Sequence, residues 1–303
     1  MSRPGHPGLR RSVIAVVCLA VTAGVMGSSA TTAHSVAITP MRVLQMNLCD
    51  SGIASCFTGR SVAEAANVIR AAKPDVVTLN EVCRPDVAAL DETLTSAVHE
   101  DGGGVVVYAF QAAGDRLTAD AYRCRNGQPY GIGLVVRIPA HVGYTLFSGL
   151  YPTQDLNDPE ERAWLCIYAL GDFYACTTHL ADTSPSIALA QCADLLRTII
   201  PAVRERNRAA APAVIGGDFN LGTAGQANIA TCVPAGYVWR GDGGVQYVLA
   251  TADLGPASER AIAMLGTTDH PGLLVTLTRS AVPAAATGSH CPTVLTHPRS
   301  RCP

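Results

Sequence analysis

The sequence predicts an α/β protein in which mixed β-sheets form a sandwich with helices on the outside. The chain begins with a strand–helix–strand unit and continues with a run of strands joined by short connections. Few helical segments are left to cover the resulting sheets. The 303 residues, 48% of them apolar, are enough to bury the core of one enzyme-sized domain.

The strand–helix–strand unit occupies residues 42–79. Arg42–Leu48 alternates as a strand does, and Val76–Leu79 is a nearly continuous apolar strand. Between them, Ser61 and Glu64 form a capping-box pattern, which predicts a helix that begins there and is stopped by Lys73-Pro74. Two strands joined by a helix of this length normally run parallel, so the residues that follow them should lie at one edge of one sheet.

The later segments predict the rest of the sandwich. Five strands with short connections should pair antiparallel: Val105–Phe110, Tyr130–Arg137, Val142–Phe147, Ala163–Leu170 and Phe173–Thr178. Ser184-Pro185 opens a helix with one apolar face, made by Cys192, Leu195, Leu196 and Ile199. Three further strands complete the domain: Ala213–Phe219, Val245–Thr251 and Leu273–Thr278.

The first residues predict an export signal. Arg3, Arg10 and Arg11 precede the apolar run Val13–Met26, which small residues follow. The run is shorter than the roughly 20 residues of a membrane span, so an uncleaved anchor is the lesser alternative, and a twin-arginine signal is matched only in part. We expect a signal peptide at 1–37, one domain at 38–280, and a tail at 281–303 closed by a disulfide. The mature protein should be a secreted monomer without stable membrane insertion.

The charge limits the kinds of partner. Without its leader the chain keeps 19 basic and all 24 acidic residues, a formal balance of −5. Proteins that bind nucleic acid through a broad electrostatic surface are usually basic, so that class is disfavoured. An enzyme that contacts one phosphate locally is still allowed.

The cysteines support export. Eleven cysteines minus Cys18 of the leader leave ten, an even number, which predicts five disulfides in an oxidising compartment. Spacing favours three pairs, namely Cys49 with Cys56, Cys166 with Cys176 and Cys291 with Cys302. The other four allow more than one pairing: Cys83, Cys124, Cys192 and Cys232. A cysteine metal site is the weaker alternative, because no C-x-x-C pair occurs.

Polar residues stand at the ends of five predicted strands. They are Asn47, Glu81, His179, the pair Asp218 and Asn220, and Asp269-His270 before the last strand. Such residues bind hard cations and transfer protons. Asp218 and Asn220 are two apart, so they face one spot, and Gly216-Gly217 before them leave room for a close approach. A local turn explains any one of these strand ends, but the set of five favours one shared site.

Six segments in order carry a family resemblance: "VLQMNL", "KPDVVTLNEV", "YGIGLVV", "TTHLA", "VIGGDFNL" and "TTDHPGLLVTL". Over about residues 41–279 the chain resembles the endonuclease/exonuclease/phosphatase superfamily. The resemblance implies a deoxyribonuclease I-like fold, a four-layered α/β/β/α sandwich of two mixed sheets with the active site at one edge. It implies a metal-dependent phosphoric ester hydrolase in which Glu81 binds Mg²⁺, or alternatively Mn²⁺ or Ca²⁺, with Asn47 beside it.

The resemblance also implies roles for the other strand-end residues. Asp218 and Asn220 would position the attacking water and a phosphate oxygen. His270 would act in proton transfer with Asp269 supporting the site, and His179 would contact the scissile phosphate.

One position departs from the family pattern. An Asp that holds the last histidine usually stands where this chain has Gln246. An amide oxygen can still orient an imidazole, but it supplies no charge to the imidazolium. Three outcomes follow: a shifted working pH for His270, replacement of the acid by Asp242, or loss of turnover. The strand Tyr130–Arg137 also lacks a glutamate that deoxyribonuclease-type members carry there, which weakens the nuclease interpretation more than the hydrolase one.

The substrate class stays open at this stage. The leading hypothesis is a secreted phosphodiesterase or endonuclease acting on DNA or RNA, with Arg116, Arg123 and Arg125 as candidate backbone contacts. The first alternative is a phosphatase or phospholipase C-type hydrolase of small or lipid phosphates, including phosphomonoesters. The second alternative is a catalytically impaired binding protein, which Gln246 keeps open.

Overall fold

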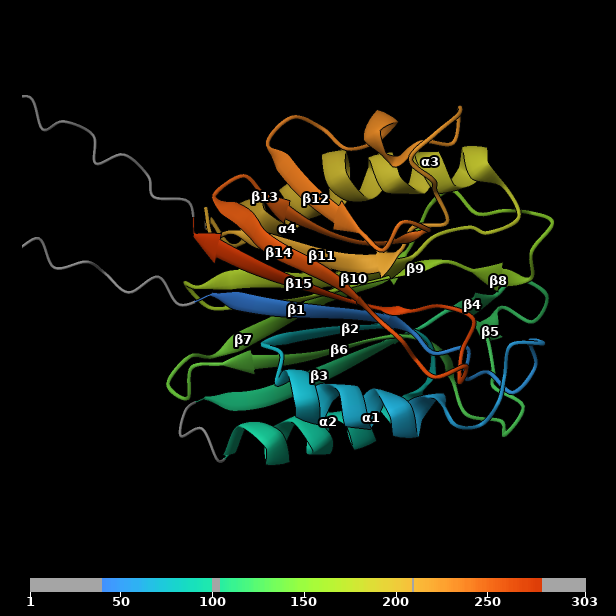
Figure 1. Cartoon of the computed structure of the whole chain (residues 1–303). Helices are drawn as coiled ribbons and strands as arrows, with labels where there is room; N and C mark the ends of the chain where they lie inside the picture. The colour runs from blue at the N-terminus through green and yellow to red at the C-terminus, as the bar shows by residue number, and fades with distance from the viewer. Residues whose placement is uncertain (1–39, 100–103, 209, 280–303) are drawn as a thin grey trace, which may run out of the picture. The chain divides into compact units, whose positions relative to one another are not determined.

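Two six-stranded mixed sheets form the centre of the protein (Figure 1). The computed structural model describes residues 40–99, 104–208 and 210–279. In spatial order the first sheet contains β14 (Leu254–Ile262), β15 (Gly272–Arg279), β1 (Met41–Asn47), β2 (Val76–Cys83), β6 (Tyr130–Ile138) and β3 (Val105–Ala112). The second contains β12 (Tyr237–Gly241), β13 (Gln246–Thr251), β11 (Ala213–Asp218), β10 (Phe173–His179), β9 (Ala163–Ala169) and β7 (Tyr144–Leu150).

Helices cover both outer faces. On the first sheet lie α1 (Ser61–Ala72) and α2 (Arg84–His99), and on the second lie α3 (Pro185–Asp194), a π-helical turn η1 (Leu195–Ile199) and α4 (Ile200–Arg206), as Figure 1 shows. Smaller elements are the 3₁₀ turn η2 (Ile229–Thr231) and a three-stranded sheet of β5 (Asp120–Ala121), β4 (Gly114–Asp115) and β8 (Glu160–Glu161). The predicted four-layered α/β/β/α sandwich is confirmed.

Three apolar clusters hold the layers together. One lies between the two sheets and contains Val43, Leu134, Leu165, Val214 and Val275, all at most 2% exposed. The other two lie between each sheet and its own helices. A sheet residue faces either the partner sheet or the helices, so both faces of the central strands are apolar, and their sequences are nearly continuous hydrophobic runs.

The strand pairing agrees with the sequence prediction. The helix-connected pairs β1–β2 and β10–β11 are parallel, whereas β9–β10, β7–β9 and β3–β6 are antiparallel. Because β1 and β2 run parallel, Asn47 lies opposite Asn80, next to Glu81. The predicted convergence of strand ends at one edge therefore follows from the topology.

The predicted capping box is wrong. The residue before α1 is Arg60, and its side chain makes no cap hydrogen bond. Ser61 is already helical, and its hydroxyl lies 3.5 Å from Asp50 Oδ1. The helix does end as predicted, because Lys73 adopts a left-handed conformation just before Pro74.

Among the elements longer than three residues, α2, β12 and β14 were not predicted. In α2 the buried residues Val87, Leu90, Leu94 and Val98 recur at helical spacing, but Asp, Glu and Thr between them lower the apolar signal. β14 is largely exposed and therefore lacks an apolar pattern. The π turn η1 also shifts the predicted helix face, so that Ile200 is buried and Ile199 only partly so.

The helical segment Pro185–Arg206 is long and apolar enough to cross a membrane by length and composition alone. In the protein its apolar side packs on the second sheet through Cys192, Leu195, Leu196 and Ile200, each at most 1% exposed. Core packing therefore accounts for its composition.

Four disulfides join the described cysteines. The predicted pairs Cys49–Cys56 and Cys166–Cys176 are confirmed. The pairing that the sequence left open is Cys83 with Cys124 and Cys192 with Cys232. The predicted pair Cys291–Cys302 lies outside the described residues. A disulfide-rich domain of this kind is compatible with an extracellular protein.

We predict that Gly216→Ala destabilises the fold. A Cβ at Gly216 in β11 would overlap the Thr78 hydroxyl and lie 2.9 Å from Thr78 Cβ in β2, on the partner sheet. Overpacking of this kind costs about 1–3 kcal/mol, measurable as the free energy of unfolding in urea. The matched control is Gly222→Ala, where the added Cβ meets nothing closer than 3.9 Å. Equal stabilities of the two variants would contradict the prediction.

Candidate active site

A cavity of about 320 Å³ lies at the edge where the two sheets meet, and we name it the edge cavity. Six of the seven residues predicted from the sequence line it: Glu81, His179, Asp218, Asn220, Asp269 and His270. The seventh, Asn47, is 1% exposed and donates hydrogen bonds to two of them, Glu81 and Asp218. The structure therefore brings all the predicted strand ends together.

Strand register and backbone conformation aim these residues. His179 lies opposite Asp218 because β10 and β11 are parallel. The pairing of β2 with β6 shifts between Leu79 and Val82, and Glu81 within this bulge has φ +54°. Asn220 has φ +50°. Left-handed conformations are rare for residues other than glycine, and bulges re-aim side chains, so both residues are turned into the cavity by their backbone.

Asn47 holds two carboxylates with its amide nitrogen. Its Nδ2 donates to Glu81 Oε1 at 2.8 Å and to Asp218 Oδ2 at 3.0 Å. Its Oδ1 accepts the backbone N–H of Cys49 at 3.1 Å. A backbone N–H can only donate, so this contact fixes which end of the amide faces the acids. In this arrangement Asn47 orients both acids, and both line the cavity.

Gln246 contacts Asp218 and Gln45 in place of the histidine that the family pattern suggests. Its Nε2 donates to Asp218 Oδ2 at 2.9 Å, and its Oε1 accepts from Gln45 at 2.8 Å. His270 Nε2 lies 3.6 Å from Asp218 Oδ2 and 3.8 Å from Asp269 Oδ1. Among the described residues no hydrogen bond joins Gln246 to His270. Asp242 does not line the edge cavity, and its Oδ1 accepts the backbone N–H groups of Gly244 and Gln246; in the part of the chain that the structure describes, no hydrogen bond or ion pair joins it to His270.

His179 is paired with a buried arginine that the sequence analysis did not identify. Arg162 is 3% exposed, and its Nη1 lies 2.9 Å from His179 Nδ1 and 3.1 Å from His179 Nε2. Burial first, and then the charge of Arg162, lower the pKa of His179 well below its usual range. A neutral imidazole can accept from Arg162 at only one of these nitrogens, the one without a proton, and the N–H at the other is the group that could donate to a substrate oxygen.

Arg162 is itself held by three acids. Its Nη2 donates to Asp158 and Asp182 at 3.0 Å each, and Glu160 Oε1 lies 3.2 Å from Nη1. Glu160, Arg162 and Asp182 also line the edge cavity. The sequence did not predict these residues as part of the site, because they precede β9 or follow β10 and no motif marks them. These strands are antiparallel, so the start of one lies at the same edge as the end of the other.

The residues present fit a divalent cation. Burial raises the pKa values of Glu81 and Asp218, and in Glu81 the nearby charge of Asp218 raises it further. Ionised carboxylates crowded in a poorly hydrated site repel one another, and a hard cation with oxygen ligands offsets that repulsion. Glu81, whose carboxylate lines the cavity and is held by Asn47, could bind it.

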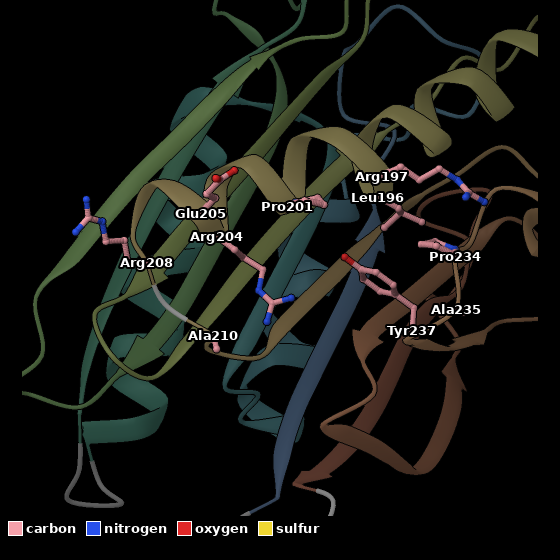
Figure 2. Close-up of a pocket in the computed structure, with 10 residues that line it drawn as sticks. All are labelled: Leu196, Arg197, Pro201, Arg204, Glu205, Arg208, Ala210, Pro234, Ala235 and Tyr237. Carbon is pink, nitrogen blue, oxygen red and sulfur yellow. The ribbon is translucent and has the colours of Figure 1, made fainter.

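A second hollow, of about 770 Å³, lies between the helical segment η1–α4 and the residues that lead into β12 (Figure 2). It is lined by Arg197, Arg204, Glu205, Arg208 and Tyr237 among others. Ala210, which precedes β11, also borders it, so it lies near the end of that strand opposite to Asp218. It contains no pair of carboxylates or histidines for the predicted chemistry, and the edge cavity is therefore the candidate active site.

Comparison with known proteins decides the family. Residues 53–270 match the Endonuclease/Exonuclease/phosphatase family. The chain belongs to the endonuclease/exonuclease/phosphatase family. Members of this family are phosphoester hydrolases that generally depend on a divalent metal ion, so the predicted enzyme class is confirmed. No curated protein sequence matches this family member.

Solved structures show the same fold at low sequence identity. An endonuclease/exonuclease/phosphatase from Beutenbergia cavernae has a TM-score of 0.58 at 20% identity, covering 81% of this hydrolase and 73% of that chain. The human Nocturnin catalytic domain with bound sulfate anion has a TM-score of 0.55 at 16% identity, covering 80% and 94%. Truncated TDP2 from Caenorhabditis elegans has a TM-score of 0.52 at 15% identity, covering 79% and 98%.

We predict that Glu160 makes the stability of this hydrolase fall as pH rises. Burial raises the pKa of Glu160 from 4.5 to about 7, although Arg162 lowers it in part. A carboxyl group whose pKa is higher in the folded state contributes stability that is fully present below its unfolded pKa. That contribution is lost as pH rises through about 7. Between pH 5 and 8, wild type should lose about 1–3 kcal/mol of unfolding free energy relative to Glu160→Gln.

The measurement is urea unfolding at each pH. Glu161→Gln, on the same short strand β8, is the matched control and should follow the wild-type pH profile. Parallel profiles for wild type and Glu160→Gln would contradict the assignment of this pH dependence to Glu160.

Proposed function

We propose that this protein is a secreted, divalent-metal-dependent phosphodiesterase, with nucleic acid as its leading substrate. The observation that supports this most is the shared cavity of Glu81, His179, Asp218, Asn220 and His270. These residues come from strand ends of both sheets, and together they supply a cation ligand, proton-transfer groups and phosphate contacts.

The metal proposal rests on Glu81. Its carboxylate faces the cavity and is fixed by Asn47. When bound, the cation would polarise a phosphoryl oxygen and offset the charge that develops during hydrolysis. Mg²⁺ is the expected ion, with Mn²⁺ or Ca²⁺ as alternatives that share its preference for oxygen ligands.

The remaining residues divide the work of hydrolysis. Asp218 presents a carboxylate whose orientation is set by hydrogen bonds, and it orients the attacking water. Asn220 holds a phosphate oxygen. His179 donates to the scissile phosphate, with Arg162 holding its ring, and His270 transfers a proton with Asp269 beside it. Because the groups converge before substrate arrives, little reorganisation is needed in the transition state.

A small phosphate ester is the second candidate substrate, and one observation favours it. Five carboxylates line the edge cavity, those of Glu81, Glu160, Asp182, Asp218 and Asp269, against one arginine. Such a lining is unfavourable for a polyanion until a cation binds.

The three arginines predicted to contact a nucleic-acid backbone also have other partners or lie at another hollow. Arg116 donates to the carbonyls of Leu156 and Asp158, and Arg123 pairs with Asp120. Arg125 lines a separate hollow with Asp50 and Asp86.

We predict metal-dependent cleavage of phosphodiesters. The residue 38–303 protein should hydrolyse bis-p-nitrophenyl phosphate and nick supercoiled plasmid with Mg²⁺ or Mn²⁺. Chelator should abolish both activities, and Glu81→Gln and His270→Ala should each lower kcat by about 10²–10⁴-fold, as expected when a cation ligand or a proton-transfer group is removed. His141→Ala, an exposed histidine away from the cavity, is the matched control.

The outcomes separate the candidate functions. Ester hydrolysis without plasmid nicking would favour the small or lipid phosphate esters over nucleic acid. Metal binding without turnover of any ester would favour the noncatalytic binding protein.

We further propose that residues 1–37 direct export and are removed. Full-length protein produced in a bacterial host should be recovered from the exported fraction as a monomer that begins at Ile38, as shown by mass spectrometry and light scattering. Replacing Arg10 and Arg11 with lysine tests the twin-arginine alternative. Recovery of the intact chain in the membrane fraction would support the uncleaved anchor instead.

A further inference from the structure

Two glutamines lie between the sheets directly behind Asp218. Gln45 on β1 and Gln246 on β13 are both 0% exposed. They belong to different sheets, yet Gln45 Nε2 donates to Gln246 Oε1 at 2.8 Å. A buried amide is costly unless its groups are paired, so this pair must be satisfied in full.

The orientation of both amides follows from one backbone group. The N–H of Asp218 donates to Asn80 Oδ1 at 2.7 Å, which fixes the oxygen of Asn80 at that position. The same oxygen accepts from Gln45 Nε2 at 2.7 Å, and the Thr78 hydroxyl donates to Gln45 Oε1. The remaining N–H of Gln45 therefore meets Gln246 Oε1, and Gln246 must turn its nitrogen the other way.

The nitrogen of Gln246 then faces the carboxylate of Asp218. Gln246 Nε2 donates to Asp218 Oδ2 at 2.9 Å, and Asn47 Nδ2 donates to the same oxygen at 3.0 Å. This oxygen is also the one that lies 3.6 Å from His270 Nε2. Two buried amide donors thus hold one carboxylate oxygen toward the imidazole.

We propose that Gln246, oriented by Gln45, is a positioning residue that holds Asp218 Oδ2 toward His270, so that Asp218 serves as the carboxylate partner of that histidine. Gln246 acts through Asp218 and does not touch the substrate. The inference rests on the proposed function of the edge cavity, and it assigns the glutamine a constructive role in the site.

The proposal predicts the effect of a carboxylate at position 246. An ionised Asp or Glu side chain there can accept from Gln45 but cannot donate to Asp218, so two carboxylates would face each other. Restoring the family's Asp should therefore harm this chain. If Gln246 were only a defect in the site, the same change would improve turnover.

The test compares three variants of Gln246 and one control variant on bis-p-nitrophenyl phosphate with Mg²⁺ or Mn²⁺. Gln246→Met removes the donor to Asp218 and the acceptor for Gln45. The lost hydrogen bond to the charged Asp218 should lower kcat about 10-fold, and the unpaired Gln45 N–H should lower stability. Gln246→Glu and Gln246→Asp add a facing carboxylate and should lower kcat about 10–100-fold or more. KM should stay within about 3-fold, since the substrate contacts are intact.

Gln191→Glu is the matched control. Gln191 is also 0% exposed, accepts from the Ala181 N–H and donates to the Thr153 carbonyl, both at 2.9 Å. The same loss of a buried donor should lower its thermal stability and leave kcat within about 2-fold. An equal loss of kcat in Gln191→Glu would attribute the effect to stability and overturn the proposal, as would a Gln246→Asp variant at least as active as wild type.

A second readout does not depend on turnover. Crystal structures of wild type and Gln246→Met should show the Asp218 carboxylate rotated away from His270 in the variant only. An unmoved carboxylate would overturn the positioning role even if the wild-type enzyme is active. Absence of turnover in wild type with both Mg²⁺ and Mn²⁺ would instead overturn the proposed function, and the crystallographic comparison would still decide the role of Gln246.

Discussion

The close approach of the two sheets at Gly216 and Thr78 is the constraint on which the active-site edge depends. The absence of a side chain at Gly216 leaves room for Thr78 from the partner sheet. That room lets polar side chains, those of Gln45, Thr78, Asn80 and Gln246, lie fully buried between β1, β2 and β13. Thr78 donates to Gln45, Gln45 donates to both Asn80 and Gln246, and Gln246 donates to Asp218. Sheet packing and carboxylate orientation are thus parts of one arrangement.

Charge at the edge cavity follows from the same burial. Glu81, Asp218 and Glu160 all have raised pKa values, and in each case the largest cause is removal from water. Arg162 lies among three carboxylates and beside His179, so one buried cation fixes several groups. A bound divalent cation would complete this balance. The two histidines differ because His179 is buried against Arg162, whereas the side chain of His270 is 24% exposed.

The elements that the sequence predicted are those with a strong apolar pattern. Central strands such as β2 and β11 are buried on both faces, and their composition shows it. β14 is exposed and α2 is amphipathic with a weak apolar face, so neither stood out. The site residues were found at strand ends, whereas Glu160 and Arg162 at the start of an antiparallel strand were overlooked. Finding them required knowledge of the pairing.

The sequence by itself determined the sandwich of mixed sheets and the residues that meet at its edge, because local periodicity and strand order predict both. Six motifs in order identified the family through their resemblance to it. Only the tertiary structure decided what those residues contact. The amide nitrogen of Gln246 faces Asp218 because its amide oxygen accepts a hydrogen bond from Gln45, 201 positions away in the sequence. Arg162 stabilises His179 across two strands. Hydrogen bonds between distant residues depend on how the layers pack, and no local pattern in the sequence records that packing.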